Sequence, residues 1–353
     1  MASQLRDTAW LEWVASLMGI ASRQTYTATL PPDRFHCLLD ELPLHLIPQG
    51  FLRSGRVRNI LQQPLFLNPQ CWIYPAGQWP EELADREELV AGFGRQGSIA
   101  WVREPATGSL LPFWLGPRLQ AVVQGLRRNE PAPPTLTEDE RFRLAAAGIL
   151  IAQDQIAQDQ ANQAPSERNE LMARGATAFR EKGYMPLRAL IHPFHVAALR
   201  RYYRHQVRRG VFRLGDDGNP LRYVANNESV ARFFHHQLTS TVGLVAGQPV
   251  KPSYVYFASY LSGAELIKHT DRPQCEFSIT LCLDFSPEPE LETSWPIRLD
   301  TCEGTVAVYQ ALGDGLVYRG TKVPHYRSVL AEGHTSTSIF FHYVPADFSG
   351  PLQ

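Results

Sequence analysis

The pattern of hydrophobic and polar positions changes along the chain, and its last hundred residues are typical of β-structure. From residue 252 onward, short runs rich in Tyr, Phe, Val, Ile and Thr are separated by Gly, Pro and Asp. Several short strands with turn residues at close intervals are typical of a sandwich or barrel. We expect strands near residues 253–261, 276–285, 296–300, 304–310, 315–319 and 336–344.

The segment before this β-rich region has a mixed pattern. It predicts a short strand at 184–188, a helix across 193–209 and a second helix over 228–238, with a turn and helix cap at Asn226 and Asn227. Three arginines in the first of these helices recur every four residues, at 200, 204 and 208, so they share one helix face. We interpret that face as solvated, with a partner-binding patch as the alternative.

The N-terminal half combines a few regular segments with Pro-rich stretches. The pattern predicts a helix over 3–22 and strands over 98–103 and 110–115. Thr137 and Glu140 have the spacing of a capping box, which predicts a helix from there towards Ile151. The Gln/Asp/Ala-rich stretch 153–163 has little to bury, so it predicts a domain boundary near residue 170.

Composition narrows the class of protein. Of the 353 residues, 44% are hydrophobic and 20% charged, which is ordinary for a globular protein with a sizeable core. A net charge of -1 gives no reason to expect nucleic acid or an anionic membrane as a partner. The five cysteines are odd in number and form no CxxC, so we expect neither a disulfide scaffold nor a structural zinc site. With no signal-peptide core and no long apolar run, we expect a cytoplasmic protein.

One group of residues carries chemistry. His269 and Asp271 are two residues apart, and in an extended segment such residues project to the same side. His325 follows 54 residues after the aspartate, beside a proline. Two imidazoles and one carboxylate on one face of a metal leave the opposite face open, which is the arrangement of non-haem iron(II) oxygenases. We therefore predict that His269, Asp271 and His325 bind iron(II).

Residues 252–344 resemble the catalytic core of the 2-oxoglutarate and iron(II)-dependent oxygenases, in the prolyl-hydroxylase-like branch. The resemblance rests on Tyr260 and Gly263 ahead of His269-Thr-Asp271, on Gly313-Asp-Gly315, on Pro324-His325 and on the closing segment 336–343. It implies an α+β chain in which residues 171–353 form a double-stranded β-helix (jelly roll) with buttressing helices. Residues 1–170 would then be a smaller mixed α/β region with an accessory role. The resemblance also implies iron(II), 2-oxoglutarate as cosubstrate and dioxygen.

The chain departs from this family's pattern at one point. Members usually carry Arg or Lys nine or ten residues after the distal histidine, to pair with the far carboxylate of 2-oxoglutarate, whereas here those positions are His334 and Thr335. Neither offers the planar fork of arginine. The remaining candidates for cosubstrate binding are His334 with the hydroxyls of Ser336 and Ser338, Arg327 on the metal side of its strand, Arg298 on a neighbouring strand, and Tyr260.

The functional hypothesis is a dioxygenase that hydroxylates an amino-acid side chain (free, carrier-bound or in a peptide) or a small metabolite. By resemblance, the intact Asp271 favours hydroxylation over halogenation. The alternative is a catalytically silent jelly-roll module that binds a metal or a small acid, favoured by the missing basic residue. Demethylation of nucleic acid is disfavoured by the near-zero net charge.

Overall fold

The computed structural model describes residues 31–53, 62–105, 107–154 and 167–353. The helix predicted over 3–22 and most of the stretch 153–163 lie outside the described residues. The chain divides into two compact units. The first comprises Met1–Arg86, Phe93–Ala164 and Pro193–Tyr202, and the second Glu87–Gly92, Pro165–His192 and Tyr203–Gln353. The boundary near residue 170 and the accessory role of residues 1–170 stay predictions.

The first unit contains two small antiparallel sheets. One pairs β1 (Leu65–Leu67) with β5 (Leu150–Ala152), and the other has the order β2 (Cys71–Pro75), β3 (Ser98–Arg103), β4 (Leu110–Leu115). Both strands predicted between residues 98 and 115 are therefore present. Within the described residues, the helices of this unit are η1 (Leu39–Glu41), η2 (Leu44–Leu46), α2 (Gln49–Arg53), α4 (Glu81–Ala84), α5 (Pro117–Gly125), α6 (Glu138–Ala146) and the first residues of α9 (Pro193–Arg208).

The capping box is confirmed at the start of α6, but the predicted extent of this helix is wrong. The Thr137 side chain accepts from the backbone N–H of Glu140, and the Glu140 side chain accepts from that of Thr137. The helix ends at Ala146 instead of continuing towards Ile151. Gly148 adopts a φ of 73°, a left-handed conformation that ends helices, and the chain then enters β5.

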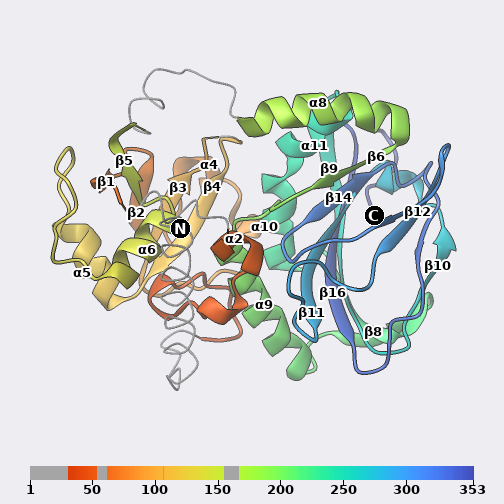
Figure 1. The fold of residues 1–353 in the computed structure, drawn as a ribbon, viewed down its shortest axis with the longest axis horizontal. Coiled ribbons are helices and arrows are strands. Elements are labelled where there is room, and N and C mark those ends of the chain that lie inside the picture. The colour runs from red at the N-terminus through yellow and green to blue at the C-terminus, as the bar shows by residue number, and fades with distance from the viewer. Residues whose placement is uncertain (1–30, 54–61, 106, 155–166) are drawn as a thin grey trace, which may run out of the picture. The chain divides into compact units, whose positions relative to one another are not determined.

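The second unit is built on two antiparallel sheets (Figure 1). The larger has seven strands in the order β6-β14-β11-β16-β9-β8-β7, and the smaller has four in the order β10-β15-β12-β13. Their bounds are β6 (Tyr184–Leu187), β7 (Arg213–Asp216), β8 (Asn219–Asn226), β9 (Val250–Tyr260), β10 (Leu266–His269), β11 (Phe277–Ser286), β12 (Ile297–Thr301), β13 (Gly304–Val308), β14 (Gly315–Tyr318), β15 (His325–Arg327) and β16 (Thr335–Pro345).

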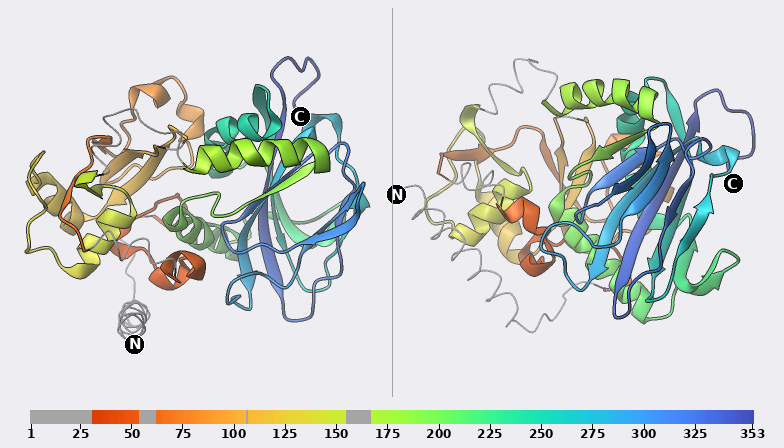
Figure 2. Two further views of the ribbon diagram at one scale, coloured as in Figure 1. Left: turned by 45° about the horizontal axis from the view of Figure 1, so that its top comes forward. Right: turned by 45° about the vertical axis from the view of Figure 1, so that its right-hand side comes forward.

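The strand order identifies the fold. From β9 to β16 the chain passes back and forth between the two sheets: β9, β11, β14 and β16 are in the larger one, and β10, β12, β13 and β15 in the smaller. Eight antiparallel strands wound in this way form a jelly roll. The predicted double-stranded β-helix is confirmed, with β6, β7 and β8 extending the larger sheet. Figure 2 shows the two sheets facing each other from two further directions.

Helices buttress the larger sheet, as predicted. The second unit contains η3 (Glu87–Leu89), α8 (Glu167–Lys182), α10 (Ser229–Gln237), α11 (Thr239–Ala246), η4 (Pro273–Cys275) and the last residues of α9 (Pro193–Arg208). α10 and α11 contact β9, and α8 contacts β6. His235 on α10 contacts β16 twice. Its ring Nε2 lies 2.8 Å from the His342 carbonyl oxygen, and its backbone carbonyl accepts from the Tyr343 hydroxyl at 2.7 Å.

Two details of these helices differ from the prediction. The cap of α10 is Glu228, whose carboxylate accepts from the Ala231 N–H, while Asn227 turns the chain with a φ of 48°. The arginine stripe of α9 is solvated only at Arg208, which is exposed. Arg200 is completely buried, and Arg204 forms an ion pair with Asp284 at 2.6 Å, because the helix packs its basic side chains against acceptors.

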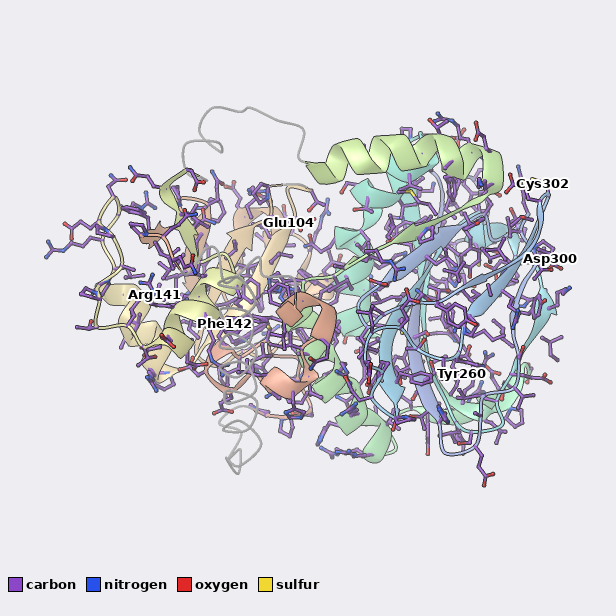
Figure 3. All side chains as sticks on the ribbon, in the orientation of Figure 1. Glu104, Arg141, Phe142, Tyr260, Asp300 and Cys302 are labelled. Atoms are coloured by element: carbon purple, nitrogen blue, oxygen red, sulfur yellow. The ribbon has the colours of Figure 1, made fainter. Side chains whose placement is uncertain are left out.

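The inward faces of the two sheets enclose the core of the jelly roll. Tyr260 pairs with Ser336 across β9 and β16, and Figure 3 places its side chain among the strands of this unit. Side chains on one face of paired strands point the same way, so residues at alternate positions share this interior. They form one cluster at Ala258, Tyr260, Ala264, Cys282, Phe285, Trp295, Leu312, Leu330 and Phe340 and a second at Ile297, Leu299, Val308, Leu316, Tyr318 and Val323.

Candidate metal centre

The three predicted ligands come together at one end of the smaller sheet. His269 is the last residue of β10, and its cross-strand partner is His325, the first residue of β15. Asp271 follows β10 and is fixed by its backbone N–H, which donates to the Gly320 carbonyl at 2.8 Å. The bounds of β10 and β15 were not predicted, although His269 was expected in an extended segment and Arg327 on a strand.

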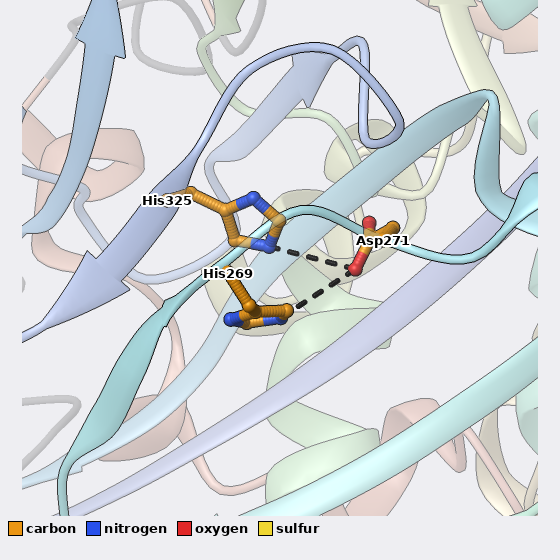
Figure 4. Close-up of side chains that lie close together, drawn as sticks. All are labelled: His269, Asp271 and His325. Atoms are coloured by element: carbon orange, nitrogen blue, oxygen red, sulfur yellow. Dashed lines mark ion pairs between the residues drawn. The ribbon is translucent and has the colours of Figure 1, made fainter.

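The side chains of these residues converge on one carboxylate oxygen (Figure 4). The Nε2 atoms of His269 and His325 each lie 3.6 Å from Oδ1 of Asp271. Each ring also contacts a backbone carbonyl through Nδ1, of Ile267 at 2.7 Å and of Val323 at 3.0 Å. A carbonyl only accepts, so Nδ1 carries the proton in each ring and the Nε2 lone pair is left for a metal.

Electrostatics keeps Asp271 ionised and His325 neutral, but it favours a proton on His269 that a bound metal would displace. Burial acts to raise the pKa of Asp271, but the His269 contact, the neighbouring histidines and Ser278 lower it to about 2. The contact with Asp271 raises the pKa of His269, and burial lowers the pKa of His325. One ionised carboxylate and two imidazoles within 4.8 Å of one another suit a divalent cation, since ligand atoms sharing an ion at bonds of about 2.1 Å lie within about 4 Å.

The other oxygen of Asp271, Oδ2, is held by a hydrogen bond on the side away from the histidines. The Ser278 hydroxyl donates to Oδ2 at 2.9 Å and also contacts Nδ1 of His342 at 2.8 Å. A β-bulge between Phe341 and Tyr343 lies at His342, which faces the cavity. Gly320 leaves the space that the carboxylate occupies, because an added Cβ there would overlap Asp271 Oδ2 and the Cys275 carbonyl. These contacts orient the ligand.

A second donor group, Asp271 with Cys275 and His342, lies beside the first. Burial raises the pKa of the Cys275 thiol to about 12, so it is not a thiolate. Nδ1 of His342 is already engaged by Ser278. The His269–Asp271–His325 group is therefore the better metal site.

The open side of this group faces a cavity of about 650 Å³. Its size lies in the range of small-molecule sites. Aromatic side chains make up much of its wall, and the charged residues among its lining that are exposed are Arg213, Asp217 and Arg272. The lining residues are Arg213, Asp216, Asp217, Gly218, Arg222, Val224, Asn226, Tyr254, Tyr256, Tyr260, Leu266, His269, Asp271, Arg272, Tyr318, His325, Phe340 and His342.

Of the arginines predicted to bind the cosubstrate, only Arg327 lies on the interior side. It is 4% exposed, and its guanidinium donates to the Trp295 carbonyl and, at 3.3 Å, to Oε1 of Gln310. Its Nε has no hydrogen-bond partner among the described residues, and neither has Oγ of Ser338. No ion pair within the described ranges involves Arg327. A cation and a hydroxyl are thus left partly unsatisfied inside the barrel.

The structure does not bring Arg298 and His334 to the site. Arg298 pairs with Tyr326, whereas its neighbour Leu299 pairs with His325. Alternation along the strand therefore turns Arg298 to the outer face of the sheet. His334 lies in the turn before β16, where Nδ1 contacts the Glu332 carbonyl at 3.0 Å and the ring packs against Phe285. Of the remaining candidates, Ser336 is buried, and Tyr260 lines the cavity.

A charged network in the cavity wall was missed by the sequence analysis. Arg222 of β8 donates to both carboxylate oxygens of Asp216, to Oδ1 at 2.9 Å and to Oδ2 at 2.7 Å, and to the Tyr260 hydroxyl at 3.1 Å. The Tyr256 hydroxyl also donates to Asp216. The signal for this hairpin was the Asp217-Gly218 dipeptide, a strong indicator of a two-residue turn.

Comparisons with known proteins add three solved structures of interest. The epimerase SnoN from nogalamycin biosynthesis shares 14% identity with a TM-score of 0.41, over 50% of this chain and 83% of SnoN. A prolyl-4-hydroxylase of Pseudomonas putida has the same identity and score over 49% and 98% of the two chains. HygX of Streptomyces hygroscopicus, solved with nickel, 2-oxoglutarate and hygromycin B, shares 14% identity with a TM-score of 0.40, over 50% and 88%.

No protein-family model and no curated protein matches the chain. The scores and identities of the structural matches are low, so the fold assignment rests on the strand order and the site on its own contacts. None of the helices within the described residues combines the length and apolar character needed to span a bilayer.

Proposed function

We propose that this protein is an iron(II)- and 2-oxoglutarate-dependent oxygenase. The observation that carries the proposal is the convergence of two histidine Nε2 atoms on one oxygen of Asp271, beside a cavity in a jelly roll. Two imidazoles and one carboxylate with open positions favour non-haem iron(II) over a structural zinc site, which is closed by four protein ligands. Iron(II) bound there, with 2-oxoglutarate and dioxygen, supplies the oxidation of an unactivated C–H bond.

We assign the far carboxylate of 2-oxoglutarate to Arg327. The charges of two other arginines near the barrel are already paired, Arg222 with Asp216 and Arg204 with Asp284, and the cavity-lining Arg213 and Arg272 are exposed, not buried. A buried guanidinium without a counter-charge costs several kcal/mol, and a carboxylate brought by the cosubstrate would remove this cost. Arg327 lies two residues from His325 on β15, about 7 Å along the strand. This separation suits a five-carbon dicarboxylate held at its other end by the metal.

The supporting hydroxyls come from β16, in the larger sheet. Ser338 and Ser336 of β16 face the interior, and the Ser338 Oγ has no hydrogen-bond partner among the described residues. Tyr260, held by a hydrogen bond from Arg222, lines the cavity and pairs with Ser336 across the two strands. The missing basic residue at the ninth or tenth position after His325 is then replaced by an arginine on β15, in the other sheet.

The reaction that we propose is hydroxylation, of an amino-acid side chain (free, carrier-bound or in a peptide) or of a small metabolite. Asp271 occupies the position of the carboxylate ligand and is fixed there by Ser278. The cavity volume favours a small molecule over a folded protein partner. The aromatic wall excludes water and positions the substrate beside the metal ligands.

Anaerobic reconstitution tests this proposal. Full-length protein with iron(II) and 2-oxoglutarate is expected to develop a visible absorption band and to form succinate after air is admitted. His325→Ala should lose both signals, whereas Arg298→Gln, on the outer face of the sheet, should keep them. Absence of the band and of succinate in the wild-type protein would contradict the proposal.

The second candidate is a binding module without turnover, favoured by the absence of Arg or Lys at positions 334 and 335. The same experiment separates the two. A silent module would bind the metal, and even a small acid, but would release no succinate in air with any substrate tried.

A further inference from the structure

The charged residues around the cavity leave an excess of positive charge at its mouth. Three arginines and three aspartates line the cavity. Arg222 and Asp216 neutralise each other in a two-pronged ion pair, and Asp271 is a proposed metal ligand. Arg213, Arg272 and Asp217 remain, and within the described residues no ion pair involves any of them.

Filling the proposed site does not remove this excess. A divalent metal, the dianion of 2-oxoglutarate, Asp271 and Arg327 have charges that cancel. One uncompensated positive charge then remains at the mouth, where the substrate enters. A low-dielectric wall strengthens its attraction for an anion.

Arg272 is the better placed of the two free cations. It directly follows the metal ligand Asp271, so its backbone position is set by the metal site. Its Cζ lies 5.2 Å from the centre of the Tyr254 ring, and Nη2 donates to the Tyr254 hydroxyl at 2.9 Å. Burial raises the pKa of Tyr254, which therefore remains a neutral acceptor.

Tyr254 is itself fixed. Its ring packs against His342 with centroids 4.6 Å apart, and its hydroxyl contacts the Cys275 Sγ at 3.0 Å. The guanidinium is thereby preorganised beside the metal cavity while most of its donors stay free. A planar guanidinium with free donors is suited to bind a carboxylate or phosphate with two hydrogen bonds.

We propose that the substrate is a small organic anion, and that Arg272 binds its carboxylate or phosphate group at the mouth of the metal cavity. This inference rests on the proposed function and names the substrate class of the same site. Arg213, on β7, adds to the positive potential of the cavity, but no described aromatic ring or hydroxyl holds its guanidinium as Tyr254 holds that of Arg272.

The test is a binding measurement on the full chain loaded with manganese(II) and saturating 2-oxoglutarate, so that turnover is not the readout. Calorimetric titrations compare benzoate with benzamide, 3-phenylpropanoate with its amide, and phenyl phosphate with phenol. In the wild-type protein at least one anion is expected to bind about tenfold or more tightly than its neutral partner. The benzoate and phenyl phosphate arms distinguish a carboxylate from a phosphate.

Matched variants locate the effect. Arg272→Gln should reduce the preference for the anion to about twofold or less and leave the manganese affinity unchanged. Arg272→Lys should give an intermediate value, and Arg298→Gln should keep the full preference. The proposal is overturned if no anion of the set is preferred by the wild-type protein, or if Arg272→Gln retains the preference.

A repeat without 2-oxoglutarate separates this inference from the proposed function. If the cosubstrate does not bind, the Arg272-dependent preference is still measurable on the metal-loaded protein. If iron and 2-oxoglutarate give succinate but Arg272 has no effect on anion binding, only the substrate class is wrong.

Discussion

Ser278 donates its hydroxyl hydrogen to Oδ2 of Asp271 at 2.9 Å, which leaves Oδ1 of the same carboxylate facing both histidines. The carboxylate is thus oriented from the larger sheet, while the imidazoles come from the smaller one. The metal site consequently depends on the two sheets keeping their positions relative to each other.

Removal of the Ser278 hydroxyl should weaken metal binding without abolishing it. Ser278→Ala is expected to reduce iron(II) affinity about 10- to 100-fold, because partners behind metal ligands typically contribute that much. Metal titration monitored by the visible band in the presence of 2-oxoglutarate measures the effect. Ser253→Ala, which removes a hydroxyl bonded to the Gln274 carbonyl, is the control and should leave the affinity unchanged.

Arg327 should determine cosubstrate affinity. Arg327→Gln is expected to raise the dissociation constant for 2-oxoglutarate by about 30-fold or more, because a buried charged hydrogen-bond partner contributes at least about 2 kcal/mol. Metal affinity in the absence of 2-oxoglutarate should change little. Equal 2-oxoglutarate affinity in Arg327→Gln and Arg298→Gln would show that the anchor lies elsewhere.

Gly320 should be required for the metal site. Gly320→Ala places a methyl group against Oδ2 of Asp271 and the Cys275 carbonyl. We expect a loss of about 1–3 kcal/mol in the free energy of unfolding, together with greatly weakened metal binding. Gly125→Ala is the control, because nothing lies within 4 Å of its added Cβ. Chemical denaturation and metal titration give the two values, and wild-type metal affinity in Gly320→Ala would contradict the expectation.

Metal stabilisation should increase with pH. The contact with Asp271 raises the pKa of His269, so the proton held there stabilises the apo protein at low pH, and this contribution is lost as the pH rises through the raised pKa. A metal must displace that proton, which costs about tenfold in apparent affinity for each pH unit below this pKa.

The measurement is the difference in Tm between manganese-loaded and apo protein from pH 5.5 to 8. We expect this difference to increase with pH and to level off on the alkaline side. A difference that is constant over the range would indicate that no proton is released from the site.

The ion pair between Arg222 and Asp216 should stabilise the β7–β8 hairpin. Both side chains are largely buried, so Asp216→Asn leaves a buried cation and is expected to cost about 3 kcal/mol in the free energy of unfolding. The double variant Asp216→Asn/Arg222→Gln should recover part of this loss. Glu130→Gln, which removes an exposed pair with Arg127, should change stability by about 1 kcal/mol or less.

The sequence was sufficient for most of the regular structure of the jelly roll. Its longer strands, such as β9, β11 and β16, were predicted within a few residues because each is a long apolar run between turn residues. The bounds of the short strands β10 and β15 were not predicted, although both segments were expected to be extended. Their pairing is stabilised by neighbouring strands in the sheet and not by a local pattern.

The sequence by itself also determined the candidate ligands. A histidine and a carboxylate two residues apart share one side of an extended chain, which is a local property of the backbone. It did not determine which arginine enters the barrel. Arg298 and Arg327 were equal candidates until cross-strand pairing placed Leu299, and not Arg298, opposite His325.

Tertiary structure alone decided that three further side chains reach the site: those of Ser278, His342 and Arg222. The first is oriented by its pairing between β14 and β16, the second lies at a bulge, and the third enters the cavity through a hairpin added to the sheet. Local sequence fixes the alternation of side chains along a strand. Which face becomes the interior is set only when the strands pair, because a register shift of one residue exchanges the two faces.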